Sequence, residues 1–322
     1  MTTIEILRGT LTSPMVLAFV LGVAGTLAGS DLRLPKAVST GLSTYLLFAI
    51  GLKGGVALSA ASPGEVVVPA LAVLALGVIT PLVAFTAALR LLPVGRTDAS
   101  AIAAHYGSVS AVTFAAAITI FEGSGVPVES FAPALLAMLE VPGIVVALTL
   151  AAAVVGGGRS GWGGALREAV LGKSIVLLVG GLAIGWIAGA DGTAPVDPFF
   201  RDLFLGALTL FLLDLGVTAA RRAEGLRAAG PGLLALGVLV PLVNGTLGVV
   251  LATAAGLSVG GSAVVGIMAA SASYIAAPAA VRVALPDANP AYYLTASLGI
   301  TFPLNLIAGI PLFFALARAL GG

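Results

Sequence analysis

Long apolar segments separated by short polar joints repeat along the whole chain. Crossing the apolar core of a bilayer takes about 20 residues in an α-helix. No alternation of apolar and polar positions marks the segments as barrel strands, so they predict helices that satisfy their own backbone hydrogen bonds. The ten predicted spans are Pro14–Ala28, Ala37–Leu58, Val66–Leu92, Ala99–Phe121, Phe131–Val155, Ser174–Ala190, Leu203–Ala220, Leu233–Ala255, Ser262–Val281 and Ala291–Leu320.

Basic residues gather in the joints that follow the odd-numbered spans. Eleven lie there or at the adjoining span edges: Arg33, Lys36, Arg90, Arg96, Arg159, Arg167, Lys173, Arg221, Arg222, Arg227 and Arg282. The opposite side has only Arg8, Arg201 and Arg318. Because cytoplasmic joints carry the excess of Lys and Arg, both termini are expected outside a bacterial inner membrane. The longest joint, Gly156–Lys173, leaves no room for a soluble domain.

The two halves of the chain repeat each other. Leu74–Val83 matches Leu234–Val243 at eight of ten positions, a shift of 160 residues. At nearly the same shift Ser108–Ser110 meets Ser271–Ser273. Each half holds five spans, an odd number, so the second half must enter the membrane with the opposite polarity. We therefore expect two inverted five-helix repeats, residues 1–160 and 161–322, a construction typical of secondary transporters.

Composition narrows the function further. Hydrophobic residues make up 59% of the chain and charged residues 9%, with a mean hydropathy of +1.14, whereas soluble domains carry about 25% charge. The absence of cysteine excludes disulfides, thiolate metal sites and cysteine nucleophiles. The net charge of +1 argues against nucleic-acid binding. No GxSxG, HExxH or phosphate-loop motif is present, so an enzyme is not expected.

Polar, flexible inserts interrupt spans 4 and 9 near the predicted midplane. Span 4 carries His105–Ser110, and span 9 carries Ser271–Tyr274 followed by Pro278. Transporters built from inverted repeats bind cargo at such interruptions, where free backbone groups face the ligand. We expect the substrate-binding residues to be Gly107, Ser108, Ser110, Ser271 and Ser273. Serine and glycine also permit close helix packing, which is the alternative interpretation.

Glu140 lies about nine residues into span 5, again near the midplane. A carboxylate at that depth is costly and marks a functional site by default. It would serve as an oxygen ligand for Na⁺ or as a proton carrier, with neutral oxygens from Thr301 and Asn305 of span 10. A buried structural hydrogen bond is the alternative.

Three other ionisable residues within the spans admit less specific predictions. Lys53 either draws anions toward the site or extends to the headgroups. Asp214 is expected to face a water-filled crevice or a helix partner, since its predicted depth excludes a direct pair with Lys53. His105 is the only histidine and is expected to pack between helices through a hydrogen bond.

Several segments resemble the sodium-dependent bicarbonate transporter family of cyanobacteria. They are Ile50–Gly55, Gly107–Ser110, Met138–Pro142 and the stretch from Leu285 to Phe313. The resemblance implies a ten-helix fold with broken helices 4 and 9. It further implies a core (spans 3–5 and 8–10), a gate (spans 1, 2, 6 and 7), a homotrimer, and bicarbonate and Na⁺ bound where the broken helices cross.

The resemblance also assigns roles to individual positions. It implies that Ser110 and Ser273 help to bind sodium, and it places Glu140 where the cyanobacterial proteins have an aspartate. Glu140, Thr301 and Asn305 would complete the expected sodium site. Two positions depart from the family. Tyr274 stands where those proteins carry an aspartate, which leaves open whether Na⁺ or H⁺ is the coupling ion. The short joint between spans 5 and 6 replaces a long cytosolic insert, and the residues do not indicate a PII-like cytosolic regulator.

The sequence therefore predicts a secondary active transporter for sodium-dependent uptake of bicarbonate by alternating access. A sodium-coupled symporter of another small anion, such as a monocarboxylate, is the alternative within this class. A passive anion channel is the alternative from another class, and it would need a continuous polar pore rather than two midplane inserts.

Overall fold

The structure is a computed structural model that describes residues 2–155 and 162–321, and every regular element in these residues is helical. The elements are α1 (Thr3–Thr12), α2 (Pro14–Leu27), α3 (Lys36–Ala60), α4 (Pro63–Leu91), α5 (Arg96–Gly107), α6 (Ala111–Gly123), α7 (Ala132–Glu140), α8 (Pro142–Val155), α9 (Trp162–Leu171), α10 (Lys173–Thr193), η2 (Ala194–Val196), η3 (Pro198–Asp202), α11 (Phe204–Ala254), α12 (Val259–Ala270), α13 (Ala277–Ala284), α14 (Pro290–Leu294), η4 (Thr295–Thr301), α15 (Phe302–Leu304), η5 (Asn305–Gly309) and α16 (Ile310–Gly321).

Most of the predicted spans appear as helices long enough to cross a membrane. Eight helical stretches in the described part of the chain meet that requirement, and α1 with α2, which meet at a bend of 53°, would make nine. The apolar helix α12 is shorter, at 12 residues. The chain therefore has the character of a membrane protein.

Three features of the helices were not expected from the apolar pattern. The first is α1, which precedes the first predicted span. The second is α9, which occupies part of the predicted Gly156–Lys173 joint, whose residues 156–161, including Arg159, lie outside the described residues. The third is span 10, which contains the π-helical stretches η4 and η5 in place of one regular α-helix. Within α11, Gly230 has φ 75° and separates two helices that correspond to spans 7 and 8.

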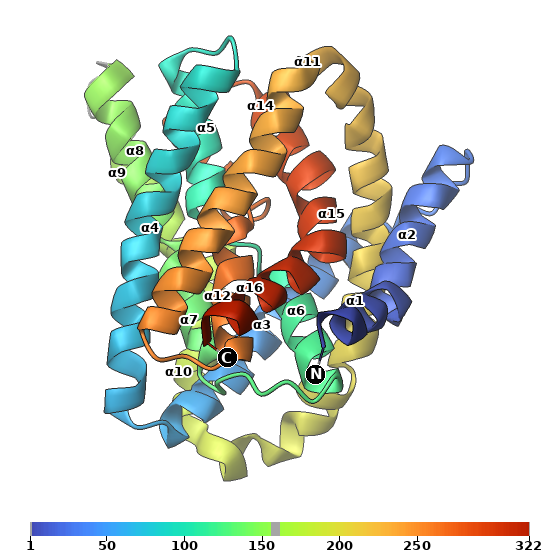
Figure 1. Ribbon diagram of the computed structural model, residues 1–322, viewed down its shortest axis with the longest axis vertical. Helices are drawn as coiled ribbons and strands as arrows, with labels where there is room; N and C mark the ends of the chain where they lie inside the picture. Colours follow the sequence, from blue (N-terminus) through green and yellow to red (C-terminus); the bar gives the residue numbers. More distant parts are fainter. Residues whose placement is uncertain (1, 156–161, 322) are drawn as a thin grey trace.

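Glycines allow two helix pairs to pack at very short distance. A β-carbon on Gly51 or Gly55 of α3 would overlap backbone carbonyl groups of α10, and one on Gly22 of α2 would overlap the carbonyl of Leu213 in α11. Such close approach is typical of small-residue packing between membrane helices. Accordingly α10 lies along α3, and α2 lies along the first half of α11 (Figure 1).

The remaining long helices surround two buried, interrupted segments. The pair α5 and α6, and likewise α12, are almost entirely buried, whereas α4 and α10 expose large apolar side chains such as Leu71 and Ile187. In Figure 1, α1 and the end of α16 lie at one end of the molecule, and the joints between α4 and α5 and within α11 lie at the other. Two of the basic joints of the predicted cytosolic side, between α4 and α5 and within α11, therefore share one end.

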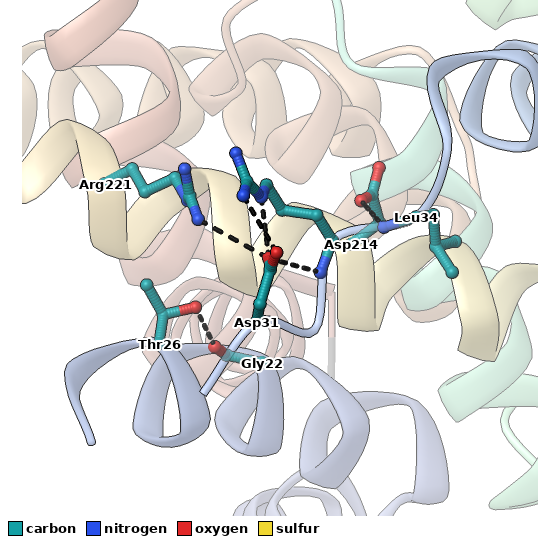
Figure 2. A network of polar contacts seen from close by, with 7 residues as sticks. Gly22, Thr26, Asp31, Leu34, Asp214 and Arg221 are labelled. Atoms are coloured by element: carbon teal, nitrogen blue, oxygen red, sulfur yellow. Dashed lines mark hydrogen bonds and ion pairs between the residues drawn. The ribbon is translucent and has the colours of Figure 1, made fainter. Parts of the chain in front are cut away.

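A polar network fastens the α2–α3 joint to α11 at that basic end (Figure 2). Asp31 accepts hydrogen bonds from the Arg33 guanidinium at 2.6 and 2.8 Å and lies 3.8 Å from Arg221. The guanidinium of Arg33 lowers the pKa of Asp31 to about 2. Elsewhere in the same network, Asp214 accepts hydrogen bonds from the Leu34 N–H at 3.4 Å and from the Ser39 hydroxyl at 2.6 Å.

Candidate functional site

Two helix interruptions meet inside the molecule. The first separates α5 from α6 at Ser108–Ser110, and the second separates α12 from α13 at Ser271–Ala276. The Ser110 N–H donates to the Ser271 Oγ at 2.9 Å, and the Ser273 N–H donates to the carbonyl of His105 at 2.8 Å. These reciprocal bonds join the interruptions directly, as the two polar inserts predicted, and we call this region the crossing.

Two helix N-termini point into the crossing. The Ser110 hydroxyl caps α6 by accepting the Thr113 N–H at 3.1 Å, and the Ser273 hydroxyl accepts the N–H of Ala277, the first residue of α13, at 3.2 Å. The first N–H groups of a helix have no partner within the helix, and the helix dipole favours negative charge there. The crossing therefore offers donors suited to a small anion.

Ser108 and Ser271 occupy corresponding positions but differ in their hydrogen bonding. The Ser271 hydroxyl donates to the Met268 carbonyl at 2.7 Å while it accepts from Ser110. The Ser108 hydroxyl is buried, with 1% of the residue exposed, and has no partner. Since buried polar atoms are nearly always paired, the free Ser108 hydroxyl is the side chain best placed to bind a ligand.

Thr301 and Asn305, predicted as ion ligands, both form hydrogen bonds beside the interruptions. The Thr301 Oγ1 lies 2.7 Å from the Tyr106 hydroxyl and donates to the Gly237 carbonyl at 2.9 Å. The Asn305 Nδ2 donates to the carbonyl of Ala270 at 2.8 Å. Tyr106 and Ala270 stand at the ends of α5 and α12, so span 10 braces both helices where they break.

Glu140 ends α7, two residues before Pro142, and is 3% exposed. Its Oε2 is buried without a hydrogen-bond partner, so no hydrogen bond to that atom supports the structural alternative. No hydrogen bond joins Glu140 to the serines of the crossing among the described residues. An unpaired carboxylate in the interior is costly unless a cation or a proton accompanies it.

Glycine is required where span 5 passes span 4. A β-carbon on Gly143 would overlap the carbonyl oxygen of Gly107, and one on Gly107 would crowd Pro81 and Gly143. The backbone of Gly107 thus lies against α8 immediately before the α5 interruption.

Tyr274 lies at the crossing, and the sequence prediction did not include it among the candidate site residues. Its hydroxyl accepts a hydrogen bond from the Ser110 Oγ at 3.2 Å, and its ring packs edge-on against Phe302 at 5.5 Å. Tyr274 also lines a cavity of about 440 Å³ that includes Lys36, Lys173 and Arg282. We call this cavity the crevice. The signals for Tyr274 were its place beside Ser273 and its departure from the family aspartate.

A second cavity lies on the other side of the crossing, toward the end that holds α1. We call it the vestibule. It has a volume of about 240 Å³ and is lined by α3, α6, the start of α11 and the segments between. Between vestibule and crevice lies a void of only about 10 Å³, too small for more than about one water. Its lining is almost wholly apolar, and we call Leu47, Ile50, Ala115, Phe211 and Ile275 the apolar waist.

One face of α3 follows this line of cavities from end to end. Lys36, Ser43 and Leu47 line the crevice, and Ile50, Lys53 and Ala57 line the vestibule. The spacing of three, four or seven residues marks one helix face. The crevice, the apolar waist and the vestibule therefore form a single line. On one side of this line lie α3 and α11, and on the other lie α6 and the crossing.

A family model matches residues 14–318 of the 322, under the description Na⁺-dependent bicarbonate transporter superfamily. The chain belongs to the Na⁺-dependent bicarbonate transporter superfamily. No curated protein sequence matches the chain. Membership of the superfamily implies Na⁺-dependent bicarbonate transport and agrees with the prediction that the chain is not an enzyme.

The superfamily description names Na⁺, so we ask which oxygen atoms of the chain could bind this ion. Among the described residues, no group of three or more His, Asp, Glu or Cys side chains forms a metal site. The buried atoms without partners include the Glu140 Oε2 and the Ser108 Oγ, both hard oxygen atoms. A weakly held monovalent cation is compatible with such oxygens, whereas a transition metal prefers nitrogen or sulfur ligands.

The other intramembrane residues also have definite places. His105 packs between helices as expected, with its Nδ1 2.7 Å from the Ala101 carbonyl and its ring stacked on Tyr293 at 4.4 Å. Asp214 lines the crevice and binds Ser39, so both of its predicted surroundings are found. Lys53 lines the vestibule, while Asp214 lies beyond the waist, in agreement with the prediction that they do not pair.

Proposed function

We propose that the chain is a secondary active transporter that takes up bicarbonate together with Na⁺ by alternating access. The observation that carries the proposal is the crossing, where two interrupted helices exchange hydrogen bonds through Ser110, Ser271 and Ser273. Their helix N-termini offer N–H donors to a small anion. Neutral donors stabilise the charge without binding so tightly that release is slow.

The substrate-binding residues in this proposal are Gly107, Ser108, Ser110, Ser271 and Ser273. Ser108 has the free hydroxyl, whereas Ser271 and Ser273 shape the crossing through the bonds that they already form. Gly107 brings its backbone close to Gly143. The bound anion would thus contact the Ser108 hydroxyl and the first N–H groups of α6.

The sodium-binding residues would be Ser110, Glu140, Ser273, Thr301 and Asn305. Glu140 supplies the only negative charge of this set, and its unpartnered Oε2 supports an ion-binding role. Thr301 and Asn305 brace the ends of α5 and α12, so their substitution would alter the ion site through the helix ends. With Tyr274 in place of an aspartate, Glu140 would carry the coupling ion, Na⁺ in the leading form of the proposal and H⁺ in the other.

Ten spans in two inverted five-helix repeats are the architecture that we propose. Its support is a set of matching contacts at the sequence shift of 160 to 161 residues. Gly77 lies against Leu139. The residues at the corresponding positions of the second half, Gly237 and Ile300, also lie against each other. The same shift relates the α4–α5 contact to the contact between α11 and α12.

Packing also supports the division into core and gate. Span 1 (α2) makes its extensive contacts with span 7, the first half of α11. Span 2 (α3) makes its extensive contacts with span 6 (α10). These pairs group spans 1, 2, 6 and 7 as the gate. Spans 3–5 and 8–10 pack around the crossing and would form the core. The line of cavities follows the boundary between the two, where α3 and α11 face α6 and the crossing.

The proposed cycle moves the core against the gate across the apolar waist. With both termini outside, the crevice would face the cytosol, because Lys36, Lys173 and Arg282 belong to the basic joints. Tyr274 lines the crevice, so the crevice would be the cytosolic approach to the crossing. Displacement of the core would close the crevice and open the crossing to the vestibule.

The assembly and location in this proposal rest on the resemblance and on the charge bias. We propose a homotrimer in the bacterial inner membrane. A cytosolic PII-like regulator is not part of the proposal, because the joint between spans 5 and 6 is short.

Uptake of labelled bicarbonate into proteoliposomes, with and without an inward Na⁺ gradient, tests the function. Na⁺-driven accumulation against a bicarbonate gradient is expected. Accumulation of a monocarboxylate but not bicarbonate would favour the alternative symporter. Flux that only dissipates gradients would favour a channel.

A further inference from the structure

Lys53 extends into the vestibule rather than toward lipid. The residue is half-buried, and its Nζ lies 5.1 Å from the centre of the Phe204 ring. Among the described residues it forms no ion pair. A cation on an aromatic face is held in position yet keeps its ammonium protons available to another ligand. The alternative from the sequence, in which Lys53 extends to the lipid headgroups, does not agree with an ammonium that lies in a protein cavity.

The other charged residues of the vestibule are already engaged or lie nearer its mouth. Arg201 pairs with Asp197 at 3.5 Å. Glu129 accepts the Ser258 N–H at 2.6 Å and its hydroxyl at 3.1 Å, at the N-terminus of α12. The fourth charged residue of the lining, Glu122, is exposed.

Depth separates Lys53 from Glu122. Ile50 and Ala115 line both the vestibule and the apolar waist, so they mark the inner end of the vestibule. At a rise of about 1.5 Å per residue, Lys53 stands about 4.5 Å beyond Ile50, and Glu122 stands about 10.5 Å beyond Ala115. Of these two residues, Lys53 therefore lies deeper in the vestibule, and Glu122 lies nearer its mouth.

We propose that Lys53 forms an anion-binding site in the vestibule, separate from the crossing, that captures a small monovalent oxyanion such as bicarbonate before the core opens to this side. The Nζ would donate to the anion while Phe204 supports the lysine. Ser130 supplies a neutral hydroxyl to the same cavity, whereas the Thr119 hydroxyl donates to the Ala115 carbonyl at 2.8 Å. A volume of about 240 Å³ accepts such an ion with water but is small for larger ligands.

This site is also distinct from the crossing by distance. Ser110 precedes Ala115 by five residues, about 7.5 Å along α6. Lys53 lies on the far side of the waist from that point. A captured anion would therefore wait one barrier away from the substrate-binding serines. The identity of the captured anion as the transported cargo rests on the proposed function. The presence of an anion site at Lys53 does not.

A test independent of transport uses the absence of cysteine from the chain. Thr119→Cys places one thiol in the vestibule, where it can be modified by a methanethiosulfonate reagent carrying either a sulfonate or a trimethylammonium group. The ratio of the negative reagent's rate to the positive reagent's rate gives the preference for an anion, to which Glu122, three residues after Thr119 on α6, also contributes. Lys53→Gln in the same background should lower that preference by about tenfold, because one nearby charge is removed. Sodium bicarbonate should slow the modification more than sodium chloride does.

Arg8→Gln is the matched control, because it removes an exposed basic charge from α1 outside the vestibule. It should leave the preference between the reagents unchanged. Equal preferences with and without the Lys53→Gln substitution would overturn the anion site. So would an equal effect of Arg8→Gln, since the preference would then report only the general surface charge.

Transport then tests the role in capture. Lys53→Gln should raise the KM for external bicarbonate by roughly three- to tenfold and leave kcat nearly unchanged, and Lys53→Arg should restore most of the loss. A lower kcat with the same KM would contradict capture. If the wild-type protein moved no bicarbonate, the proposed function would fail, whereas the thiol experiment would still decide whether the anion site exists.

Discussion

The Ser271 hydroxyl accepts the backbone N–H of Ser110 at 2.9 Å, and this bond joins two segments 161 residues apart in the chain. The corresponding hydroxyl of Ser108 is buried without any partner. One serine therefore maintains the crossing, while the other remains available to the cargo. Within two nearly identical motifs, the two hydroxyls thus differ in whether they are free to take part in the proposed anion binding.

Substitution of these two serines should have different consequences. Ser108→Ala should weaken bicarbonate binding roughly ten- to a hundredfold, because a hydrogen bond to a charged group is lost, with no loss of thermal stability. Ser271→Ala should lower the free energy of unfolding by about 1–3 kcal/mol, because the Ser110 N–H loses its partner in a buried site. Binding by calorimetry and melting in detergent distinguish the two, and equal melting losses would contradict the assignment.

Glu140→Gln should abolish the dependence of uptake on Na⁺ without destabilising the fold. The neutral amide no longer attracts the ion, and the protein no longer buries an unpaired carboxylate, so its melting temperature in Na⁺-free buffer should be unchanged or higher. Uptake measured against Na⁺ concentration gives the first result. A lower melting temperature with unchanged Na⁺ dependence would instead favour the structural hydrogen bond.

Gly143→Ala should reduce both stability and transport. The added methyl group would overlap the Gly107 carbonyl, so α8 and the end of α5 must separate. Overpacking of this kind costs about 1–3 kcal/mol. Gly180→Ala is a suitable control, since a β-carbon there meets no atom within 4 Å. The account would be contradicted if both variants melted and transported alike.

Widening the apolar waist should produce a leak. Ile50→Ala removes a side chain that separates the vestibule from the crevice, so bicarbonate should cross without Na⁺ and independently of core movement. Passive efflux from loaded proteoliposomes measures this flux. Leu52→Ala shortens another buried side chain of α3 that lines none of the three cavities and should not leak.

The two carboxylates in Figure 2 should differ in their effect on stability. Asp31→Asn removes exposed ion pairs, so only a small loss of thermal stability is expected. Asp214→Asn should cause a larger loss, because it weakens half-buried hydrogen bonds from Ser39 and Leu34. The pKa of Asp31 is lowered from 3.8 to about 2, so its contribution is present above about pH 4 and declines as the pH falls toward 2. Melting curves across that range should show a smaller decline in Asp31→Asn than in the wild type.

The periodic apolar segments predicted the spanning helices well because segment length and hydrophobicity determine whether a helix can cross a bilayer. They did not predict α9, since a short helix that packs on α13 depends on tertiary contacts. The π-helical stretches around Thr301 and Asn305 also escaped prediction. Their hydrogen-bond register follows from packing against α11 and α12, which apolar composition does not encode.

At the site, the serine inserts indicated the crossing but not the division of labour within it. Whether a serine hydroxyl is free depends on which carbonyl lies within reach, and the two serine motifs, Ser108–Ser110 and Ser271–Ser273, are alike in sequence. Tyr274 entered the sequence argument only as a missing aspartate, although its hydroxyl accepts a hydrogen bond from the Ser110 Oγ. The place of Lys53 in a cavity required the arrangement of α3, α6 and α11.

Bicarbonate accumulation in proteoliposomes, driven only by an inward Na⁺ gradient, tests the central proposal most directly. The account predicts that wild-type protein concentrates labelled bicarbonate above the external level, that collapse of the Na⁺ gradient releases it, and that Ser108→Ala reduces uptake at low substrate. Equal uptake with Na⁺ and with K⁺, or equilibration without accumulation, would contradict Na⁺-coupled transport.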